Sequence, residues 1–389
     1  MRRRCGLGIR LTPTGSDGDR DTPGRLARDD VAAALSAAFE PPDLVESPEA
    51  IPSFHRRYSP QNGTRAAIRR RRVGSSGNGG GDRMAWGYNR FADHRRVLLR
   101  SGSTVIATRA GPIEYVQAGP QAGTPVLLFH GSPGGYDQRW LLDPLLDLRC
   151  RLIAWSRPGY LRTPLTTGAG FPEQADAATG LLDELGVSKV VAYGISGGGP
   201  SALEFARRQP ARAAGLVLES AVTRSYAPEI PILARAVFLT RYGTWAAAAL
   251  SRLRPRAVVG DFVRQESTLD DRARRRAVDW IMAEPGRREI TRRLILSLTP
   301  YEDRAPGLQN DLARFAALDD SLTAGVGCPA LVLHGSHDGD VDPGHAHHAA
   351  ATIPGAVLHI VPQGWHVLRL STGHGSALEA TRTFLETVR

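Results

Sequence analysis

Cysteine is scarce in this chain of 389 residues, which contains only Cys5, Cys150 and Cys328. The three are far apart and include no Cys-x-x-Cys pair, the spacing typical of zinc sites and thiol redox motifs. We therefore expect neither a disulfide framework nor a zinc site. Cys150 and Cys328 each stand just before an apolar run and are expected to be buried thiols.

Long hydrophobic runs are also missing. No apolar run approaches the roughly 18 residues that a membrane-spanning helix needs. The chain begins with the basic stretch Met1–Arg4, but the hydrophobic region that completes an export signal does not follow it. We therefore expect a cytoplasmic protein with no membrane partner.

Lysine is nearly absent, since Lys189 is the only one among 49 lysines and arginines. Arginine, alanine, glycine and proline are all abundant, a bias that indicates a GC-rich coding sequence rather than selection for charge. The net charge of +10 is therefore a weak argument for nucleic-acid binding. We expect a small-molecule partner and no nucleic acid, cofactor or metal, and the oligomeric state stays open.

The first part of the chain, residues 1–95, differs in composition from the rest. It is rich in glycine, proline, serine and arginine, and its basic run 69–72 precedes a glycine-rich stretch. Such a segment buries too little apolar surface to offset the entropy lost on ordering. We predict a low-complexity, disordered basic extension, with a nucleic-acid-binding arm as the alternative. Met84 opens a more ordinary composition and is an alternative translation start, which the intact mass of the native protein would test.

From residue 104 onward, strand-like and helix-like segments alternate. The strand-like segments are short and rich in β-branched and other apolar residues. They span 105–108, 113–116, 125–129, 151–155, 190–195, 215–218, 330–335 and 356–361. Their alternation with helices predicts an α/β fold with a mostly parallel sheet flanked by helices. In such sheets, ligands bind beyond the carboxyl ends of the strands.

The alternation stops between residues 223 and 325. This stretch has no buried strand, and its helix-like segments are 232–238, 244–253, 270–283 and 288–298. We predict that 223–325 form a helical cap inserted between the two parts of the α/β core, 96–222 and 326–389. A cap of this kind would exclude water and shape the substrate pocket.

The segment Gly194–Gly198 has the pattern Gly-x-Ser-x-Gly between a predicted strand and a predicted helix. This is the nucleophile elbow of serine hydrolases, in which a tight turn holds the serine away from the sheet. Gly194 and Gly198 are needed because a Cβ atom at either position would keep the strand and the helix from passing each other. So short a pattern also arises by chance, and its weight depends on the rest of the chain.

Four further motifs occur in order with this elbow, each at a predicted strand end. They are HGSPGG at 130–135, SRPGY at 156–160, HGSHDGDV at 334–341 and GWH at 364–366. Together, residues 104–389 resemble an α/β-hydrolase with a helical cap, similar in motif style to proline iminopeptidases and related small-molecule hydrolases. The resemblance implies that Ser196 is the nucleophile, His366 the general base and Asp338 the acid that orients the imidazole.

Other residues are alternatives for the acid. Asp340 and Asp342 share the loop with Asp338, and Glu219 ends a neighbouring strand where some relatives carry the acid. The spacing that the family shows favours Asp338. We assign no catalytic role to His359 and His374, and no metal site to the cluster of His345, His347 and His348.

The backbone N–H groups of Gly197 and Ser132 are the expected oxyanion hole. Pro133 has no N–H to donate, which leaves Ser132 as the donor in the HGSPGG loop. His130 is expected to orient this loop through hydrogen bonds.

Three residues depart from the family pattern. Ser156 and Leu161 stand where the family often has aspartate and glycine, which puts the shape of the SRPGY loop in doubt. Trp365 stands beside His366 where glycine is frequent, and we expect its ring to narrow the pocket.

A serine nucleophile is compatible with esters, amides, thioesters and activated carbon–carbon bonds. Proline iminopeptidases recognise the amine of their substrate through cap carboxylates, and the cap glutamates available here are Glu229, Glu266, Glu284, Glu289 and Glu302. The substrate-binding residues stay unassigned. We predict a serine hydrolase that cleaves a small acyl substrate through an acyl-enzyme; a slow or non-catalytic small-molecule binding protein is the alternative.

Overall fold

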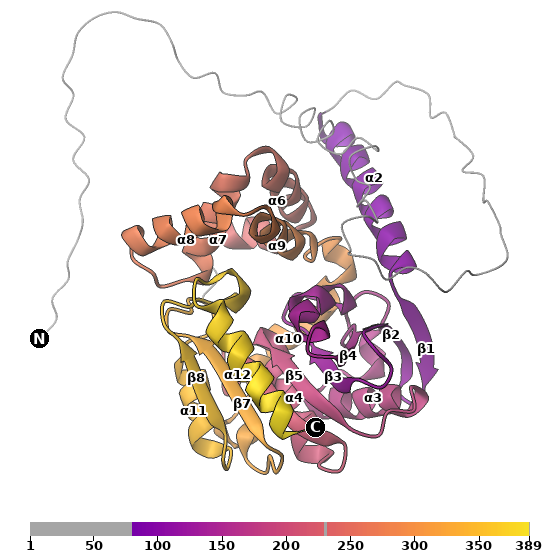
Figure 1. Ribbon diagram of the computed structural model, residues 1–389. Coiled ribbons are helices and arrows are strands. Elements are labelled where there is room, and N and C mark those ends of the chain that lie inside the picture. Colours follow the sequence, from indigo (N-terminus) through magenta and orange to yellow (C-terminus); the bar gives the residue numbers. More distant parts are fainter. Residues whose placement is uncertain (1–79, 229–231, 389) are drawn as a thin grey trace, which may run out of the picture.

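Figure 1 shows the computed structural model of the chain, which describes residues 80–228 and 232–388. The predicted basic extension lies outside the described residues up to residue 79. The described cysteines, Cys150 and Cys328, are both free and buried, as their positions before apolar runs predicted.

The centre of the fold is an eight-stranded sheet in the order β1-β2-β4-β3-β5-β6-β7-β8. β2 pairs antiparallel with β1 and β4, and the other neighbouring strands are parallel. The strands are β1 (Thr104–Thr108), β2 (Gly111–Ala118), β3 (Thr124–Phe129), β4 (Cys150–Trp155), β5 (Val190–Ile195), β6 (Ala213–Glu219), β7 (Ala330–Gly335) and β8 (Val357–Val361). The predicted fold class is confirmed, and every predicted strand has its counterpart.

The helices form two groups. Those that pack on the sheet are α3 (Phe171–Glu184), α4 (Gly199–Arg208), α11 (Gly344–Thr352), α12 (His374–Thr387) and the 3₁₀ helix η3 (Tyr136–Leu146). Those between β6 and β7, here called the cap helices, are α5 (Ile232–Phe238), α6 (Arg241–Leu253), α7 (Pro255–Glu266), α8 (Asp271–Ala283), α9 (Pro285–Leu296) and α10 (Ala305–Phe315). No helix in the described ranges combines the length and the apolar character needed to cross a membrane.

Both faces of the sheet are covered. On one face, α3, α4 and α11 bury apolar side chains together with Phe129 and Leu218. On the other face, η3 and α12 pack against Val191 and Leu331. The central strands are therefore apolar on both sides, as their continuous apolar runs require. This packing holds the carboxyl ends of β3, β5, β6 and β7 in fixed positions at one edge of the sheet.

Four of the cap helices correspond to predicted segments, but α7 and α10 do not. Buried residues in α7 are few, only Val259 and Val263, so its apolar periodicity is weak. The buried face of α10 includes a glycine and the carboxylate of Asp311, which breaks the apolar pattern. In Figure 1, α6–α9 lie together on one side of the sheet-containing part.

The prediction for residues 80–95 is wrong, because they form most of helix α2 (Gly80–Ser101). Tyr88 and Phe91 of this helix are buried in one cluster with Trp245 of α6. Met84, the alternative translation start, lies within α2 and packs against the same cluster. The low apolar content of residues 1–95 as a whole hid the helical spacing of the few apolar residues at its end.

Candidate active site

Ser196 lies at the turn between β5 and α4. It is not a glycine, yet its φ is 49°, in the left-handed region that residues with a Cβ atom seldom adopt. A Cβ atom on Gly198 would lie 2.0 Å from the carbonyl oxygen of Phe129, and one on Gly194 would lie 2.8 Å from Cβ of Ala202. The strand–turn–helix geometry predicted for the elbow is therefore present, and strain at the serine is part of it.

Two loops from distant parts of the chain bring a histidine and an aspartate to this serine. His366 follows β8, and its Nε2 is 3.1 Å from Ser196 Oγ. Asp338 follows β7, and its Oδ2 is 2.9 Å from Nδ1 of His366. The three predicted side chains thus form one continuous chain of hydrogen bonds.

Asp338 is buried and fully hydrogen-bonded. Its Oδ1 accepts from the N–H groups of Asp340 and Val341 at 3.0 and 2.9 Å. Its Oδ2 also lies 3.2 Å from Nε2 of His334. Burial alone would raise the pKa of this carboxyl, but the two imidazoles, His366 above all, hold the pKa well below its usual value. Asp338 therefore stays an anion that can orient His366.

The alternative acids have other partners. Glu219 is half-buried and accepts a hydrogen bond from Tyr193. Asp342 accepts from the N–H of Gly344 at 2.8 Å. Asp340 does face His366, but on the Nε2 side, at 3.4 Å.

Three of the histidines that were given no role have partners elsewhere. Nδ1 of His345 accepts from the N–H of Thr223, His359 contacts Ser376, and His374 contacts the carbonyl of Ser371.

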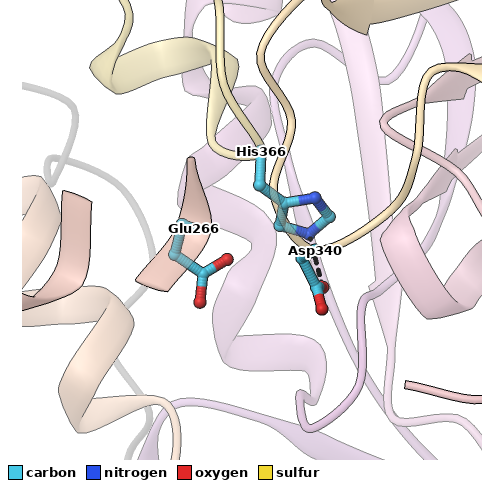
Figure 2. Close-up of side chains that lie close together, drawn as sticks. All are labelled: Glu266, Asp340 and His366. Atoms are coloured by element: carbon cyan, nitrogen blue, oxygen red, sulfur yellow. Dashed lines mark ion pairs between the residues drawn. The ribbon is translucent and has the colours of Figure 1, made fainter. Parts of the chain in front are cut away.

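Three carboxylates surround His366. Figure 2 shows Asp340 and Glu266 near the imidazole, with a dashed line for the ion pair between Asp340 and His366, and Glu266 is the last residue of α7. Burial lowers the pKa of His366, but Asp338, Asp340 and Glu266 outweigh it and raise the pKa to about 10. Burial, followed by the charge of Asp340, raises the pKa of Glu266 to about 8.

Glu266, Asp340 and His366 are the one set of side chains in residues 80–228 and 232–388 whose ligand atoms could hold a metal ion. Those atoms, on Glu266, Asp340 and His366, lie within 4.8 Å of one another. The His366 nitrogen on this side also faces Ser196. A metal ion there would therefore compete with the serine for the imidazole.

The loop after β3 lies against the elbow. A Cβ atom on Gly197 would come within 2.3 Å of Ser132 Oγ, so these two residues are direct neighbours. Within the described part of the chain, the N–H of Ser132 donates to no protein acceptor. Nδ1 of His130 bonds the carbonyl of Gly131, and Nε2 accepts from the N–H of Arg157. His130 thus orients the loop, in keeping with the sequence analysis.

A cavity of about 540 Å³ opens onto Ser196. Its floor is formed by Ser132, Ser196, Gly197 and His366. Most of its wall comes from the segment between β6 and β7 and was not assigned from the sequence. The apolar members of that wall include Phe238, Leu239, Phe262, Leu294, Leu308, Leu312 and Phe315.

The structure bears on two expectations about the cavity, one about Trp365 and one about the cap glutamates. Trp365 does not narrow it, because its ring is fully buried beneath α7, edge-on to Phe262 with ring centroids 5.8 Å apart. Among the cap glutamates, Glu266 lines the cavity, whereas Glu284, Glu289 and Glu302 pair with arginines. Glu229 lies outside the described residues.

Helix α7 was not predicted from the sequence, and the C-terminal end of this helix contacts the candidate active site. Its carbonyl at Glu266 accepts from the N–H groups of Gly339 and His366, at 3.1 and 3.3 Å. Ser267 forms an isolated antiparallel bridge with Asp338. Helix α7 therefore supports two loops, the one after β7 that carries Asp338 and the one after β8 that carries His366.

Known proteins resemble this chain over most of the described residues. Residues 124–368 match the family model for the alpha/beta hydrolase fold. The chain is 30% identical over 266 residues to an uncharacterized hydrolase of Bacillus subtilis (strain 168), YcgS, covering 67% of this chain and 90% of that protein.

A second relative has a named substrate. The chain is 27% identical over 255 residues to 2-hydroxy-6-oxononadienedioate/2-hydroxy-6-oxononatrienedioate hydrolase 2 of Pseudomonas putida, covering 64% of this chain and 82% of that protein. Among solved structures, an alpha/beta hydrolase fold protein from Nakamurella multipartita has a TM-score of 0.69 and 32% identity, over 73% of this chain and 98% of that one.

Proposed function

The chain belongs to the α/β-hydrolase family and is a hydrolase, and on this premise we propose that it cleaves small acyl substrates with Ser196, His366 and Asp338. Ser196 Oγ attacks the acyl carbon while His366 Nε2 takes the hydroxyl proton. The carbonyl oxygen becomes an oxyanion that accepts hydrogen bonds from two backbone N–H groups, those of Ser132 and Gly197.

The rest of the cycle uses the same groups. The tetrahedral intermediate collapses, the bond to the leaving group breaks, and His366 gives that group its proton. Ser196 then carries the acyl group as an ester. His366 takes a proton from water, whose oxygen attacks the ester carbon, and Ser196 leaves with the proton from His366 as the carboxylic acid is released.

One observation carries the proposal: a strained serine at a strand–helix turn lies 3.1 Å from an imidazole whose other nitrogen lies 2.9 Å from a buried aspartate. Each distance is within the range that proton transfer and orientation require. An idle serine in a glycine-rich turn would need neither the imidazole nor the aspartate.

The cavity supports an uncharged acyl group. Its walls are mainly apolar, and its acidic and basic side chains are Glu219, Glu266, Asp340, His366 and Arg264. The relative from Pseudomonas putida is named for dicarboxylate substrates. Arg264 is paired with Asp261, and the carboxylate of Asp340, joined by that of Glu266 as it ionises, would disfavour a dianion. We therefore propose neutral esters or related acyl compounds as the substrate class.

A fluorophosphonate probe tests the proposal. We expect it to label the wild-type protein at Ser196, as located by peptide mass spectrometry, and to leave a folded S196A variant unlabelled. We also expect wild-type protein to turn over p-nitrophenyl butyrate and S196A to lose that activity by at least about a thousandfold. Folded wild-type protein that is not labelled, and that is stabilised by ligands without forming product, would instead be a binding protein.

A further inference from the structure

The loop that carries Ser132 is tied to the cap by a fully buried ion pair. Arg157 of the SRPGY motif and Asp311 of α10 both have side chains with 0% exposure. The guanidinium bonds the carboxylate twice, at 3.1 and 2.6 Å. The Tyr160 hydroxyl donates to the same carboxylate at 2.6 Å. Nothing in the proposed acyl-transfer steps uses these three side chains.

The hydroxyl of Ser132 lies inside this network. It donates to Oδ2 of Asp311 at 2.5 Å and accepts from Nη2 of Arg157 at 2.9 Å. A serine hydroxyl can donate only one hydrogen bond, and here the carboxylate of Asp311 accepts it. The side chain of Ser132 is thus an anchor, and the N–H of Ser132 is the donor that stays free for an oxyanion.

A second buried arginine holds the same loop a few residues further on. Arg304, just before α10, donates to the carbonyl of Gly134 at 2.7 Å. It also bonds both carboxylate oxygens of Asp137, at 3.0 and 2.8 Å. Its side chain has 0% exposure. Both ends of the loop between Ser132 and Asp137 are therefore fixed by residues at the end of the cap helices.

Stability alone is a weak reason for such an arrangement. Taking paired charges out of water carries a large desolvation penalty, and well-packed apolar side chains often do as well or better. What a buried bidentate pair does supply is a fixed direction and distance between its partners. An oxyanion hole needs that property, since its donors must be in place before charge develops.

We propose that Asp311 and Arg304 are positioning residues, which hold the Ser132 N–H in its oxyanion-binding place from the cap side. The inference rests on the proposed function. Leu308, Leu312 and Phe315 of the same helix, α10, line the substrate cavity. A substrate that displaces α10 would therefore disturb the oxyanion hole, and one that fits the cap would leave it intact.

The experiment compares D311N with D303N. Asp303 is also near α10 and also pairs with an arginine, Arg96, at 2.9 Å, but both side chains are about 30% exposed and Arg96 belongs to α2. Fluorophosphonate titration counts the active sites of each variant, so that kcat for p-nitrophenyl butyrate is expressed per labelled site. Inhibition by 1,1,1-trifluoropentan-2-one, which forms a tetrahedral adduct with the serine, reports on the oxyanion hole.

We expect D311N to lose about 10- to 100-fold in kcat per labelled site and a similar factor in affinity for the trifluoromethyl ketone, with KM changed less than about threefold. D303N should match the wild type. Because D311N leaves Arg157 buried without its charge partner, Y160F is made as well. Y160F keeps the ion pair and removes one bond to Asp311, and we expect a smaller loss of the same kind.

The outcomes distinguish failure of the proposed function from failure of this inference alone. Wild-type protein that is neither labelled nor active overturns the proposed function and this inference with it. Wild-type protein that is active, together with D311N and Y160F that keep wild-type kcat per labelled site and ketone affinity, overturns this inference alone. A drop only in the number of labelled sites would mean that the network stabilises the fold and does not position the oxyanion donor.

Discussion

At the level of single residues, the charge around His366 decides when it can act as a base. Only the neutral imidazole can take the proton of Ser196, and the carboxylates of Asp338, Asp340 and Glu266 favour the charged form, with a pKa of about 10. We therefore expect kcat/KM to rise with pH across the neutral range, up to the pKa of His366.

Replacing Asp340 tests this directly. Asn in D340N has nearly the same shape but no charge beside Nε2, so the pKa of His366 should fall. The rising limb of the pH profile of kcat/KM should then move to lower pH, and a shift of one pH unit would increase activity at pH 7 about tenfold. The measurement is hydrolysis of p-nitrophenyl butyrate between pH 6 and 10.

The control for this prediction is D342N. Asp342 is an exposed neighbour on the same loop, and its carboxylate bonds the N–H of Gly344 rather than facing His366. A limb that moves equally in D340N and D342N, or in neither, would contradict the proposed role of the Asp340 charge.

At the level of elements, α7 and the loop that carries His366 stabilise each other. Trp365 is fully buried among Val259, Val263 and other apolar side chains of the cap, directly before the candidate base. The indole N–H of Trp365 has no hydrogen-bond partner among the described residues. Trp365 therefore contributes by filling space and not by donating a hydrogen bond.

We accordingly expect W365A to lower the free energy of unfolding by about 3–5 kcal/mol because of the cavity it leaves. W365F should lose much less, since it keeps most of the ring and removes an unpaired donor. Urea unfolding measures both changes. The same substitution in α2, W86A, is the control, because Trp86 is 60% exposed and should change stability by less than about 0.5 kcal/mol. Equal losses in W365A and W365F would contradict this account.

Sequence patterns predict elements best where one local rule suffices. The strands were predictable because burial on both faces makes each a short, continuous apolar run. The elbow was predictable because its pattern is contiguous in the chain, although the atoms that exclude a Cβ at Gly198 belong to Phe129 and His130. By contrast, Glu266 and Asp311 reach the active site through the packing of the cap helices, and no spacing along the chain links them to Ser196.

Helix α2 illustrates the same limit. Average composition favoured disorder for residues 1–95, but a few apolar side chains at helical spacing are enough when a cap helix offers Trp245 as a partner. Trp365 was placed wrongly for a related reason. Adjacency to His366 in the sequence suggested adjacency to the substrate, whereas successive residues of a loop can point in opposite directions.

At the level of the whole molecule, the net charge is positive, whereas three of the five acidic and basic side chains of the cavity are carboxyl groups. The chain carries a net charge of +10, yet its active-site cavity holds the carboxyl groups of Glu219, Glu266 and Asp340. An anionic substrate would be attracted by the protein as a whole and repelled at the site where it must react.

This opposition predicts discrimination between two esters of similar length, p-nitrophenyl butyrate and mono-p-nitrophenyl succinate. We expect kcat/KM for the anionic succinate to be about tenfold lower, with the difference growing between pH 7 and 9 as Glu266 ionises with its pKa of about 8. E266Q should reduce the difference at pH 9, and E289Q should not, because Glu289 pairs with Arg292 outside the cavity. A succinate hydrolysed as fast as the butyrate would contradict the proposed substrate class.

The near-absence of lysine has a practical consequence because of where Lys189 lies relative to β5. Lys189 is exposed and directly precedes β5, whereas Ser196 directly follows it, so the only lysine and the candidate nucleophile stand at opposite ends of one buried strand, about 20 Å apart. A solid support that couples to amines would attach the chain at this one lysine side chain or at its N-terminal α-amino group. Attachment through Lys189 would leave the end of β5 that carries Ser196 on the side away from the support.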